Sequence, residues 1–556
     1  MRIQRKEIDI PSTRREKRMR RAVVLASVAL LVFGLVVIAE TNIPETPGAH
    51  VGGTVTVGVS QTFIDMDPRV MNSVYDGYIV DSVFDDLVSL DQETLAPIPC
   101  VAKAWEVAED GSETTFYLNE GIKFHNGEDL TAEDVAYTFN WIIDPANGSP
   151  NATEYEWMQE AVVIDDYTVK IINKPEWTPY CPGIVSESAS IVPMDTCEEM
   201  GPEQFNLTPV GSGPYKFVEW LASDHITLER NEDYWLVYPN LDKIIFRPIP
   251  NLATMMLELE AGGVDVVDMM PAQDVARFQA DPNVVVQQVP SLTYFHVSFN
   301  HSHLPSSDIR FRKACILSVD ADAAIFSIFQ GLTGIRAYGV TPAALWANDR
   351  EYLQSVALEE DDAEAVRLFN ELKAEGIIPE GFETTIYCPL DPRRTQLATI
   401  VATNLQENGI NAQVQPLDWG PLLDLLYRSE ADPLGEDVEI FVMGWSGGPD
   451  PDNFIYYLYT TENAVIGTAN NYSWYSNPEV DRLVKEAATV PGCDQTTREA
   501  LYVEAQRIAF VEDLADMMGY HYIETQGVLA RVHDYTLNAL GDIEFCSPQC
   551  NVWVDE

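Results

Sequence analysis

The sequence has little positive charge. Its 556 residues include 34 Lys and Arg but 87 Asp and Glu, so the formal net charge is −53. Proteins that bind the phosphate backbone need a basic face, and an anionic membrane surface repels a chain of this charge. The composition therefore excludes nucleic acid as a main partner. Only 11 of the 34 basic residues are lysine, and low lysine beside high acid predicts stability that rises with salt.

Several motifs with a known chemistry are also missing. The sequence contains no CxxC pair, HExxH, P-loop or GxGxxG, so neither a structural zinc site nor a nucleotide-binding loop is predicted. The eight cysteines permit disulfides without fixing their pairing. Cys546 and Cys550 are close enough in sequence to pair, and so are Cys181 and Cys197.

What is present is globular material for more than one domain. The chain is 46% hydrophobic and 22% charged, with no repeat or low-complexity block. A chain of this length predicts two or three lobes.

The N-terminus predicts a membrane-associated start. Residues 1–21 contain nine basic residues, and the 18 residues of 22–39 carry no charge. As a helix that run spans ~27 Å, close to the thickness of a hydrocarbon core. We predict a cytoplasmic basic segment at 1–21, a transmembrane anchor at 22–39 and a tether at 40–52. A cleaved signal peptide is the alternative. Both interpretations place the body outside the cytoplasm, at the outer face of the cell membrane or in the periplasm.

The body alternates strand and helix patterns. A period-two strand is predicted at 53–58 and a strand pair at 161–164 and 168–172. The second half reads as strand, helix, strand, helix, strand, over 384–387, 395–406, 410–415, 419–427 and 438–443. Helix starts are predicted at Thr131, Pro478 and Thr496. This order predicts an α/β fold with a mostly parallel sheet, whose ligands bind beyond the carboxyl ends of the strands.

Several segments together resemble one family. They lie in order across residues 53–540: Phe116–Asn140, Gly211–Trp220, Leu228–Trp235, Leu241–Pro250, Ser298–Asn300 with Asp308–Ala314, and Gly444–Phe454. The chain resembles the family 5 extracellular solute-binding proteins, the dipeptide, oligopeptide and nickel receptors of ABC importers.

The resemblance implies a two-lobed fold of the periplasmic-binding-protein class II type, with a small third domain and a hinge between the lobes. Lobe I would comprise 51–82, 210–285 and 515–556, the small domain 83–209, and lobe II 286–514. Such a protein has no reaction and no cofactor. It binds a peptide or other small polar solute between its lobes and presents it to the permease subunits, and a monomer is expected.

The resemblance also bears on the ligand. In peptide-binding relatives an aspartate just after a Gly-Trp pair holds the ligand's amino group, and here the segment Trp445–Asp450 is one residue short, so that Asp450 belongs to the following Asp-Pro pair. In dipeptide-binding relatives an arginine precedes a proline and takes the carboxylate, but here Cys388 precedes Pro389. A free dipeptide is therefore not predicted. The predicted ligand is a longer peptide, and an oligosaccharide or a metal complex is the alternative.

Aromatic and polar side chains suit such a cleft. The predicted ligand-binding residues are Tyr75, Asp76, Tyr294, Arg393, Arg394, Trp445, Ser446, Gly447, Asp450 and Asn453. No catalytic or metal-binding residue is predicted. The three aromatic residues of this set suit a buried core equally well.

Two other functions are open. Gly444–Gly448 matches the G-x-S-x-G nucleophile elbow, with Ser446 as nucleophile and His521 or His533 as base, but Pro449 and Pro451 argue against the helix that this elbow needs. His296, His301 and His303 could serve a metal receptor, or lie in a solvated turn.

Overall fold

The computed structural model describes residues 50–555 with six gaps. The gaps are 72, 94, 176–188, 427–437, 465–469 and 491–492. The predicted basic segment, the apolar run at 22–39 and most of the tether lie outside the described residues. Within them, no helix is long and apolar enough to cross a membrane.

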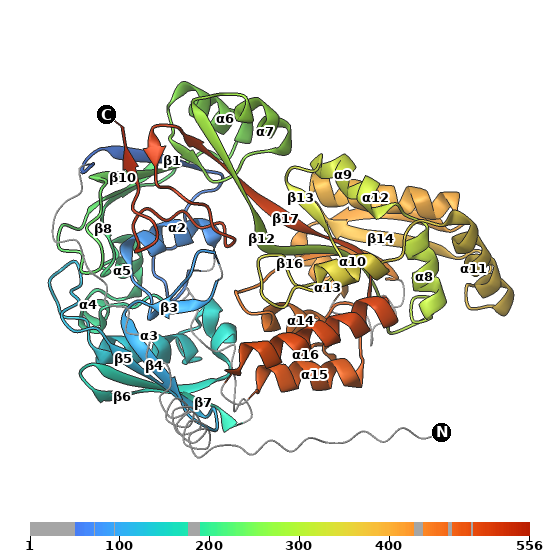
Figure 1. Ribbon diagram of the computed structural model, residues 1–556, viewed down its shortest axis with the longest axis horizontal. Helices are drawn as coiled ribbons and strands as arrows, with labels where there is room; N and C mark the ends of the chain where they lie inside the picture. Colours follow the sequence, from blue (N-terminus) through green and yellow to red (C-terminus); the bar gives the residue numbers. More distant parts are fainter. Residues whose placement is uncertain are drawn as a thin grey trace, which may run out of the picture. The chain divides into compact units, whose positions relative to one another are not determined.

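One mixed sheet of eleven strands organises the molecule (Figure 1). Its order is β15-β14-β16-β12-β17-β11-β1-β10-β9-β8, and β13 also pairs with β17. The strands are β1 Thr54–Val59, β8 Tyr215–Leu221, β9 His225–Arg230, β10 Lys243–Pro248, β11 Val266–Val267, β12 Val284–Phe299, β13 Gly334–Ala337, β14 Glu383–Pro389, β15 Asn411–Leu417, β16 Ile440–Ser446 and β17 Asp516–Leu529.

The long strands β12 and β17 join two halves of this sheet, as Figure 1 shows. They pair antiparallel from Val284↔Leu529 to Ser298↔Asp516. In the first half β1 is parallel to both β10 and β11. In the second half β14 is parallel to both β15 and β16. The fold is the expected two-lobed α/β fold, but the sheet is mixed rather than mostly parallel, because β12 and β17 are antiparallel to each other and β12 is antiparallel to β16.

Helices accompany both halves. With the first half are α2 Val74–Val83, α6 Leu252–Ala261 and α7 Ala272–Gln279; the second half has α8 Ile309–Leu317, α9 Ala321–Phe329, α10 Arg350–Val356, α11 Asp362–Glu375, α12 Pro392–Glu407, α13 Trp419–Leu426, α14 Asp452–Tyr459, α15 Pro478–Ala488 and α16 Gln495–Arg507. The carboxylate of Asp391 caps α12 by accepting the N–H groups of Arg393 and Arg394. The predicted cap of α16 at Thr496 is wrong: Asp494 is the N-cap residue, and its carboxylate accepts both the N–H and the hydroxyl of Thr497.

A separate four-stranded sheet lies within the span predicted for the small domain. Its order is β4-β5-β7-β6, and all its neighbouring strands are antiparallel. The elements here are β2 Val88–Leu90, β3 Pro97–Pro99, β4 Ala102–Val107, β5 Glu113–Leu118, α3 Ala132–Ile143, β6 Met158–Asp165, β7 Thr168–Asn173, α4 Met194–Met200 and α5 Pro202–Leu207, and a short pair β18 Val532–His533 and β19 Trp553–Val554 lies near the C-terminus. Thr131 and Asp134 form the predicted capping box at the start of α3.

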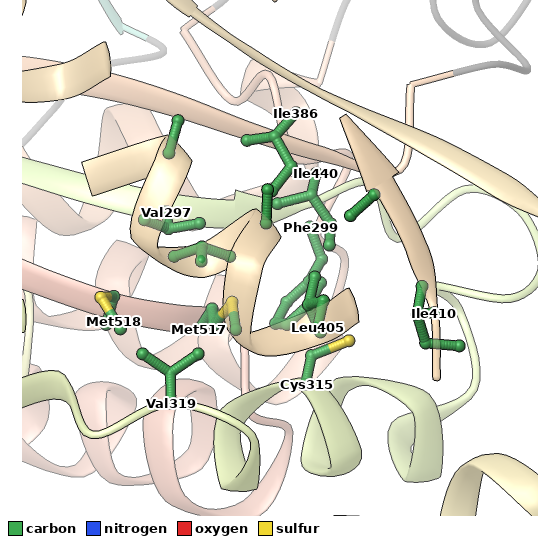
Figure 2. Packing of buried hydrophobic residues seen from close by; sticks show 14 of the residues in the cluster. Val297, Phe299, Cys315, Val319, Ile386, Leu405, Ile410, Ile440, Met517 and Met518 are labelled. Carbon is green, nitrogen blue, oxygen red and sulfur yellow. The ribbon is translucent and has the colours of Figure 1, made fainter. Parts of the chain in front are cut away.

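The largest core cluster lies in the second half of the sheet (Figure 2). Val297 and Phe299 of β12 pack with Ile440 of β16, and Leu405 of α12 belongs to the same fully buried cluster. Burying one such side chain contributes about 1.5–3 kcal/mol relative to leaving it exposed. This core holds the carboxyl ends of β14 and β16 in place.

Neither of the two cysteine pairs that are close in sequence forms a disulfide. Cys197, Cys546 and Cys550 are free thiols. The thiol of Cys546 points to the carbonyl oxygen of Val237 at 3.5 Å, whereas that of Cys550 points to the carbonyl oxygen of Asp534 at 3.2 Å. The two sulfur atoms thus face different backbone segments. Cys493 is disulfide-bonded, and Cys181 lies outside the described residues.

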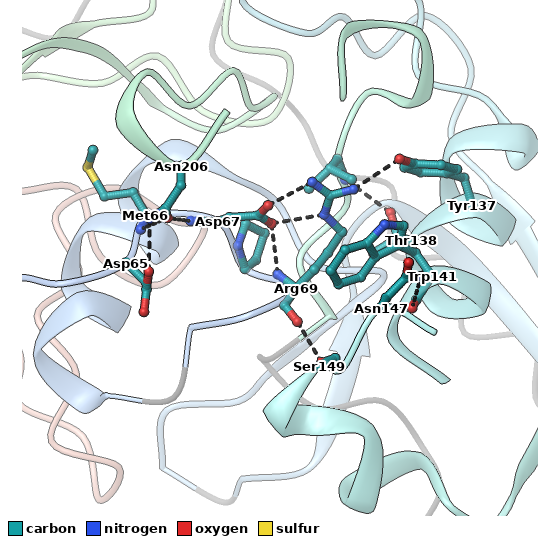
Figure 3. Close-up of polar contacts among 12 residues, drawn as sticks. Asp65, Met66, Asp67, Arg69, Tyr137, Thr138, Trp141, Asn147, Ser149 and Asn206 are labelled. Atoms are coloured by element: carbon teal, nitrogen blue, oxygen red, sulfur yellow. Dashed lines mark hydrogen bonds and ion pairs between the residues drawn. The ribbon is translucent and has the colours of Figure 1, made fainter. Parts of the chain in front are cut away.

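A buried ion pair connects the segment after β1 with α3 (Figure 3). Arg69 donates to both oxygens of Asp67, from Nε at 2.9 Å and from Nη2 at 2.7 Å. It also donates to the hydroxyl of Tyr137 at 3.0 Å, and its guanidinium lies 4.5 Å from the ring centre of Trp141. One arginine therefore ties a loop of the first half-sheet to the four-stranded domain.

Candidate functional site

Loops beyond the carboxyl ends of parallel strands form the candidate site. β14 leads through Asp391 into α12, and β16 leads into the loop at 447–451. Because β14 and β16 are parallel, with Ile386 opposite Ile440, these two loops leave the same edge of the sheet. In the first half, Ser60 and Asp268 follow the parallel strands β1 and β11, and Ser60 donates to Asp268 from its N–H at 2.8 Å and its hydroxyl at 2.7 Å. Such edges are where open α/β sheets bind ligands.

The loop after β16 is held by its own aromatic side chains. Trp445 donates from its indole N–H to the carbonyl oxygen of Asn453 at 2.6 Å. Gly447 must be glycine, because a Cβ there would lie 2.8 Å from the ring of Phe454. Ser446 is exposed, and its hydroxyl lies 3.0 Å from that of Thr293 on β12. This loop and its flanks thus contain four of the predicted ligand-binding residues: Trp445, Ser446, Gly447 and Asn453.

Asp450 is engaged inside the second half of the molecule. Arg498 of α16 binds it in a bidentate manner, with Nη2 2.9 Å from Oδ1 and Nη1 2.8 Å from Oδ2. The side chain of Asp450 is only 16% exposed. Its charge is therefore already matched by an internal arginine, and an additional ligand ammonium would have to compete with it.

Arg393 and Arg394 stand at the start of α12 and face aromatic rings of the central strands. The guanidinium of Arg393 lies 5.2 Å from the ring centre of Tyr522 on β17, and its side chain stays 43% exposed. Arg394 lies 4.5 Å from the ring centre of Phe295 on β12. Burial lowers the pKa of Arg394. Of the two, Arg393 has the solvent access that a ligand contact needs.

Tyr75 and Asp76 lie at the start of α2. Tyr75 is half-buried and meets Tyr78 edge-on at 6.2 Å. Asp76 is 1% exposed and accepts the N–H groups of Ile64 at 2.9 Å and Asp65 at 3.3 Å. Burial raises the pKa of Asp76 to about 6. This carboxylate organises the loop at 64–65, whereas Tyr75 presents an accessible ring.

Tyr294 is placed in the core. It is 2% exposed, its hydroxyl donates to Asp516 at 2.7 Å, and its ring stacks on His296 at 5.1 Å. The register pairs Tyr294 with Trp445, and Thr293 with Ser446. Side chains alternate between the faces of a strand, so Tyr294 and Thr293 point to opposite faces.

Two residues of β17 join this site without having been predicted. The ring centre of Tyr522 lies 5.2 Å from the guanidinium of Arg393, and burial raises the pKa of Tyr522. Glu524 is influenced by Arg393 and Asp268, and burial together with the charge of Asp268 raises its pKa to about 7. A signal existed in the sequence, because Tyr520, Tyr522 and Glu524 occupy one face of a strand by their period of two.

The residues proposed for a serine hydrolase or a metal receptor are not arranged for either function. His521, which pairs with Tyr294 in the register, lies on the face opposite to Thr293 and Ser446, and burial lowers its pKa to about 3. His533 pairs instead with Asp555 at 2.9 Å. His301 donates from Nε2 to the carbonyl oxygen of Ala515 at 2.9 Å. Within the described ranges, no three His, Cys, Asp or Glu residues are grouped to hold a metal ion.

Two half-sheets that share long strands, with loops gathered beyond the carboxyl ends, define a two-lobed α/β binding protein. The profile of the bacterial extracellular solute-binding proteins, family 5 Middle, matches residues 96–465. The chain therefore belongs to family 5 of the bacterial extracellular solute-binding proteins, and the resemblance carried by the sequence blocks is confirmed. This family serves ABC importers on the extracytoplasmic side of the membrane.

Individual relatives agree over most of the chain. The dipeptide-binding protein of Escherichia coli is 26% identical over 510 residues, covering 86% of this chain and 91% of the relative. Heme-binding protein A of Haemophilus influenzae is 27% identical over 454 residues, covering 77% and 79%. The solved structure of DppA from Helicobacter pylori in complex with peptide STSA has a TM-score of 0.72 and 25% identity, covering 91% and 99%.

Proposed function

We propose that the protein captures an oligopeptide between its two lobes and presents it to the permease subunits of an ABC importer, with no chemistry of its own. The observation that carries the choice of ligand is the bidentate pair of Asp450 and Arg498. Asp450 is the acid nearest to the Gly-Trp segment, and its charge is already compensated. With Cys388 before Pro389, neither pole of a free dipeptide has a dedicated partner. A longer peptide needs none, because its backbone groups supply hydrogen bonds along its length.

The remaining geometry supports a mixed aromatic and polar binding surface. Tyr75 and Tyr522 contribute rings from α2 and β17, and Arg393 contributes an accessible cation beside Tyr522. Thr293 and Ser446 contribute hydroxyl groups that face each other at 3.0 Å. Flat rings and hydroxyls suit peptide planes, and they suit sugar rings as well, which keeps an oligosaccharide or a metal complex as the alternative ligand.

Titration calorimetry of the purified chain with defined peptide, oligosaccharide and nickel–histidine pools tests the proposal. We expect heat and a change in tryptophan fluorescence with peptides of four or more residues, and weaker binding of free dipeptides. Binding to the sugar pool alone would show that the ligand is an oligosaccharide rather than a peptide. The absence of heat and of a fluorescence change with every pool would contradict the receptor function.

The substitution Arg393→Ala probes the site directly. Loss of a charged hydrogen-bond donor costs about 1.5–3 kcal/mol, so the peptide affinity should fall roughly tenfold or more. Arg482→Ala is the matched control, because Arg482 is an exposed arginine of α15, paired with Glu479 and Glu486. Equal affinities of the two variants would remove Arg393 from the site.

We further propose that Ser446 is not a nucleophile. The hydroxyl partner of Ser446 is Thr293, and none of the described histidines hydrogen-bonds to Ser446. Labelling of the chain with a fluorophosphonate probe should leave Ser446 unmodified, and covalent labelling there would restore the hydrolase alternative.

The proposal also includes a monomer tethered by residues 22–39. Cell fractionation should place the full chain with the membrane, and deletion of residues 1–40 should release it. Release of the full chain without this deletion would favour the cleaved signal peptide.

A further inference from the structure

A cavity in the second half of the molecule lies apart from the loops of the candidate site. Its volume is about 430 Å³, and its walls come from α8, β13, α10, β17 and the segment after α16. Tyr294 contributes to its wall, but Arg393, Ser446 and Asp450 do not. This volume is that of a small-molecule pocket.

Slightly more than half of the wall surface is apolar. The contributing side chains include Ile309 and Ile316 of α8, Leu353 of α10, and Phe510, Met517 and Met518. Ile309 is 42% exposed, so the apolar wall reaches the surface. Methionine side chains adapt their shape to a ligand. An apolar surface of this kind, open to water, gains free energy when an aliphatic molecule covers it.

The backbone around the cavity has two unusual features. The end of α16 continues as a single π-helical turn, Ile508–Glu512, and such turns are frequent at functional sites. Leu514, which contributes to the wall, has a left-handed φ of 52°. Arg312 holds this turn by donating to the carbonyl oxygens of Asp513 at 2.6 Å and Leu514 at 3.2 Å. A branched residue in this conformation persists only where its surroundings fix it.

The charged groups of the wall differ in their partners. Arg310 binds Asp308 and Glu375, and Arg336 binds Asp322. The carboxylate of Asp516 accepts from Tyr294 and Ser298, both at 2.7 Å. Lys313 is different: it is partly buried, and no carboxylate of the described residues forms an ion pair with it. The charge of Lys313 helps to lower the pKa of Glu364, but both carboxylate oxygens of Glu364 accept hydrogen bonds from Arg367.

The ammonium group of Lys313 thus faces the cavity with its charge available to an anion from outside the chain. Glu512, the other charged group of the wall without an ion pair among the described residues, is exposed to water, which solvates it. We propose that this cavity is a second ligand site for an aliphatic carboxylate, whose chain covers the apolar wall and whose carboxylate pairs with Lys313. The site is independent of the peptide proposed above.

Calorimetry of the full chain with octanoate, octanol and octylamine tests the proposal. We expect octanoate to bind with one site per chain, more tightly than octanol, and octylamine to bind most weakly. Lys313→Met should weaken octanoate binding up to about fivefold and abolish the preference over octanol. Lys485→Met is the matched control, because Lys485 is an exposed lysine of α15. Octylamine binding as tightly as octanoate, or octanoate affinity unchanged in Lys313→Met, would overturn the proposal.

A cavity-filling variant separates the two sites. Ala357 contributes to the cavity wall, and Ala357→Trp should abolish octanoate binding while peptide binding and the thermal transition persist. If the peptide displaces octanoate in the unmodified chain, the acid lies in the peptide site and the second site is refuted. If octanoate binds and no peptide does, the peptide proposal fails while this one stands.

Discussion

At the scale of single residues, Arg69 shows how a buried charge is made tolerable. The side chains of Arg69 and Asp67 are 2% and 1% exposed, and the guanidinium is further bound by Tyr137 and covered by Trp141. Burial opposes the charged form, but the hydrogen bonds to Asp67 raise the pKa of Arg69 above its ordinary value. The pair is therefore a specific connection between loop and domain, and its two members depend on each other.

The substitution Arg69→Met should expose this dependence. It leaves the Asp67 carboxylate buried without its cation, which costs about 3–5 kcal/mol of the free energy of unfolding. Urea denaturation measures the change. The double variant Asp67→Asn with Arg69→Met should recover part of the loss, and Arg367→Met, which removes a 56% exposed arginine, should cost no more than about 1 kcal/mol. A loss from Arg69→Met as small as that from Arg367→Met would show that the pair does not stabilise the fold.

At the scale of elements, the contact between β12 and β17 depends on glycine at one position. A Cβ atom at Gly519 would lie 2.5 Å from the ring of Tyr294, whose hydroxyl is fixed by Asp516. The ring cannot move aside without breaking that hydrogen bond. The close approach of strand and ring therefore excludes any side chain at 519.

Gly519→Ala should consequently destabilise the protein by about 1–3 kcal/mol through overpacking. Gly420→Ala is the contrasting control, because Gly420 lies in α13 with open space around its Cβ position. Alanine is favoured over glycine in helices by up to ~1 kcal/mol, so this control should be neutral or stabilising. Thermal unfolding of both variants compares the two, and a Gly519→Ala variant as stable as Gly420→Ala would contradict the packing argument.

Helix α12 and strands β12 and β17 show which features of the fold local sequence patterns can predict and which they cannot. The apolar stripe and Gly409 predicted a helix at 395–406, and α12 spans Pro392–Glu407, because periodicity and caps are local signals. The antiparallel pairing of β12 with β17 could not be predicted this way, since its partners lie more than 200 residues apart in sequence. The site follows the same rule. Ser446 and Thr293 meet only through the β12–β16 register, and the ion pair between Asp450 and Arg498 joins a loop to a distant helix.

At the scale of the whole molecule, the excess of negative charge governs how stability depends on salt. The formal net charge of −53 produces self-repulsion that salt screens. Added salt should therefore raise the thermal midpoint. Part of the charge is held at buried positions, where screening is weaker: burial, opposed by a hydrogen bond from Ser190, raises the pKa of Asp86 to about 7, and the pKa of Glu524 is also raised to about 7.

These two carboxyl groups set the sign of a pH dependence. Because their pKa values are raised, the folded protein binds more protons than the unfolded chain between about pH 4 and pH 7, and stability rises as the pH falls through that window. Burial lowers the pKa of His125 and His301 to about 4 and that of His521 to about 3. These histidines oppose the effect, because in the unfolded chain they begin to bind protons about one pH unit above their ordinary pKa of about 6.5.

Lowering the pH from 8 to 6.5 should therefore raise the free energy of unfolding by a few tenths of a kcal/mol, up to about 1 kcal/mol, as measured by urea denaturation at constant high salt. High salt matters because it suppresses the surface repulsion and leaves the buried groups to determine the slope. The variant Asp86→Asn with Glu524→Gln should lose this gain on acidification, whereas Glu199→Gln, at an exposed position of α4, should leave the profile unchanged. A stability that falls on acidification through this window, or an unaltered slope in the double variant, would show that these carboxyl groups are ionised in the folded protein and that the net charge acts through the surface alone.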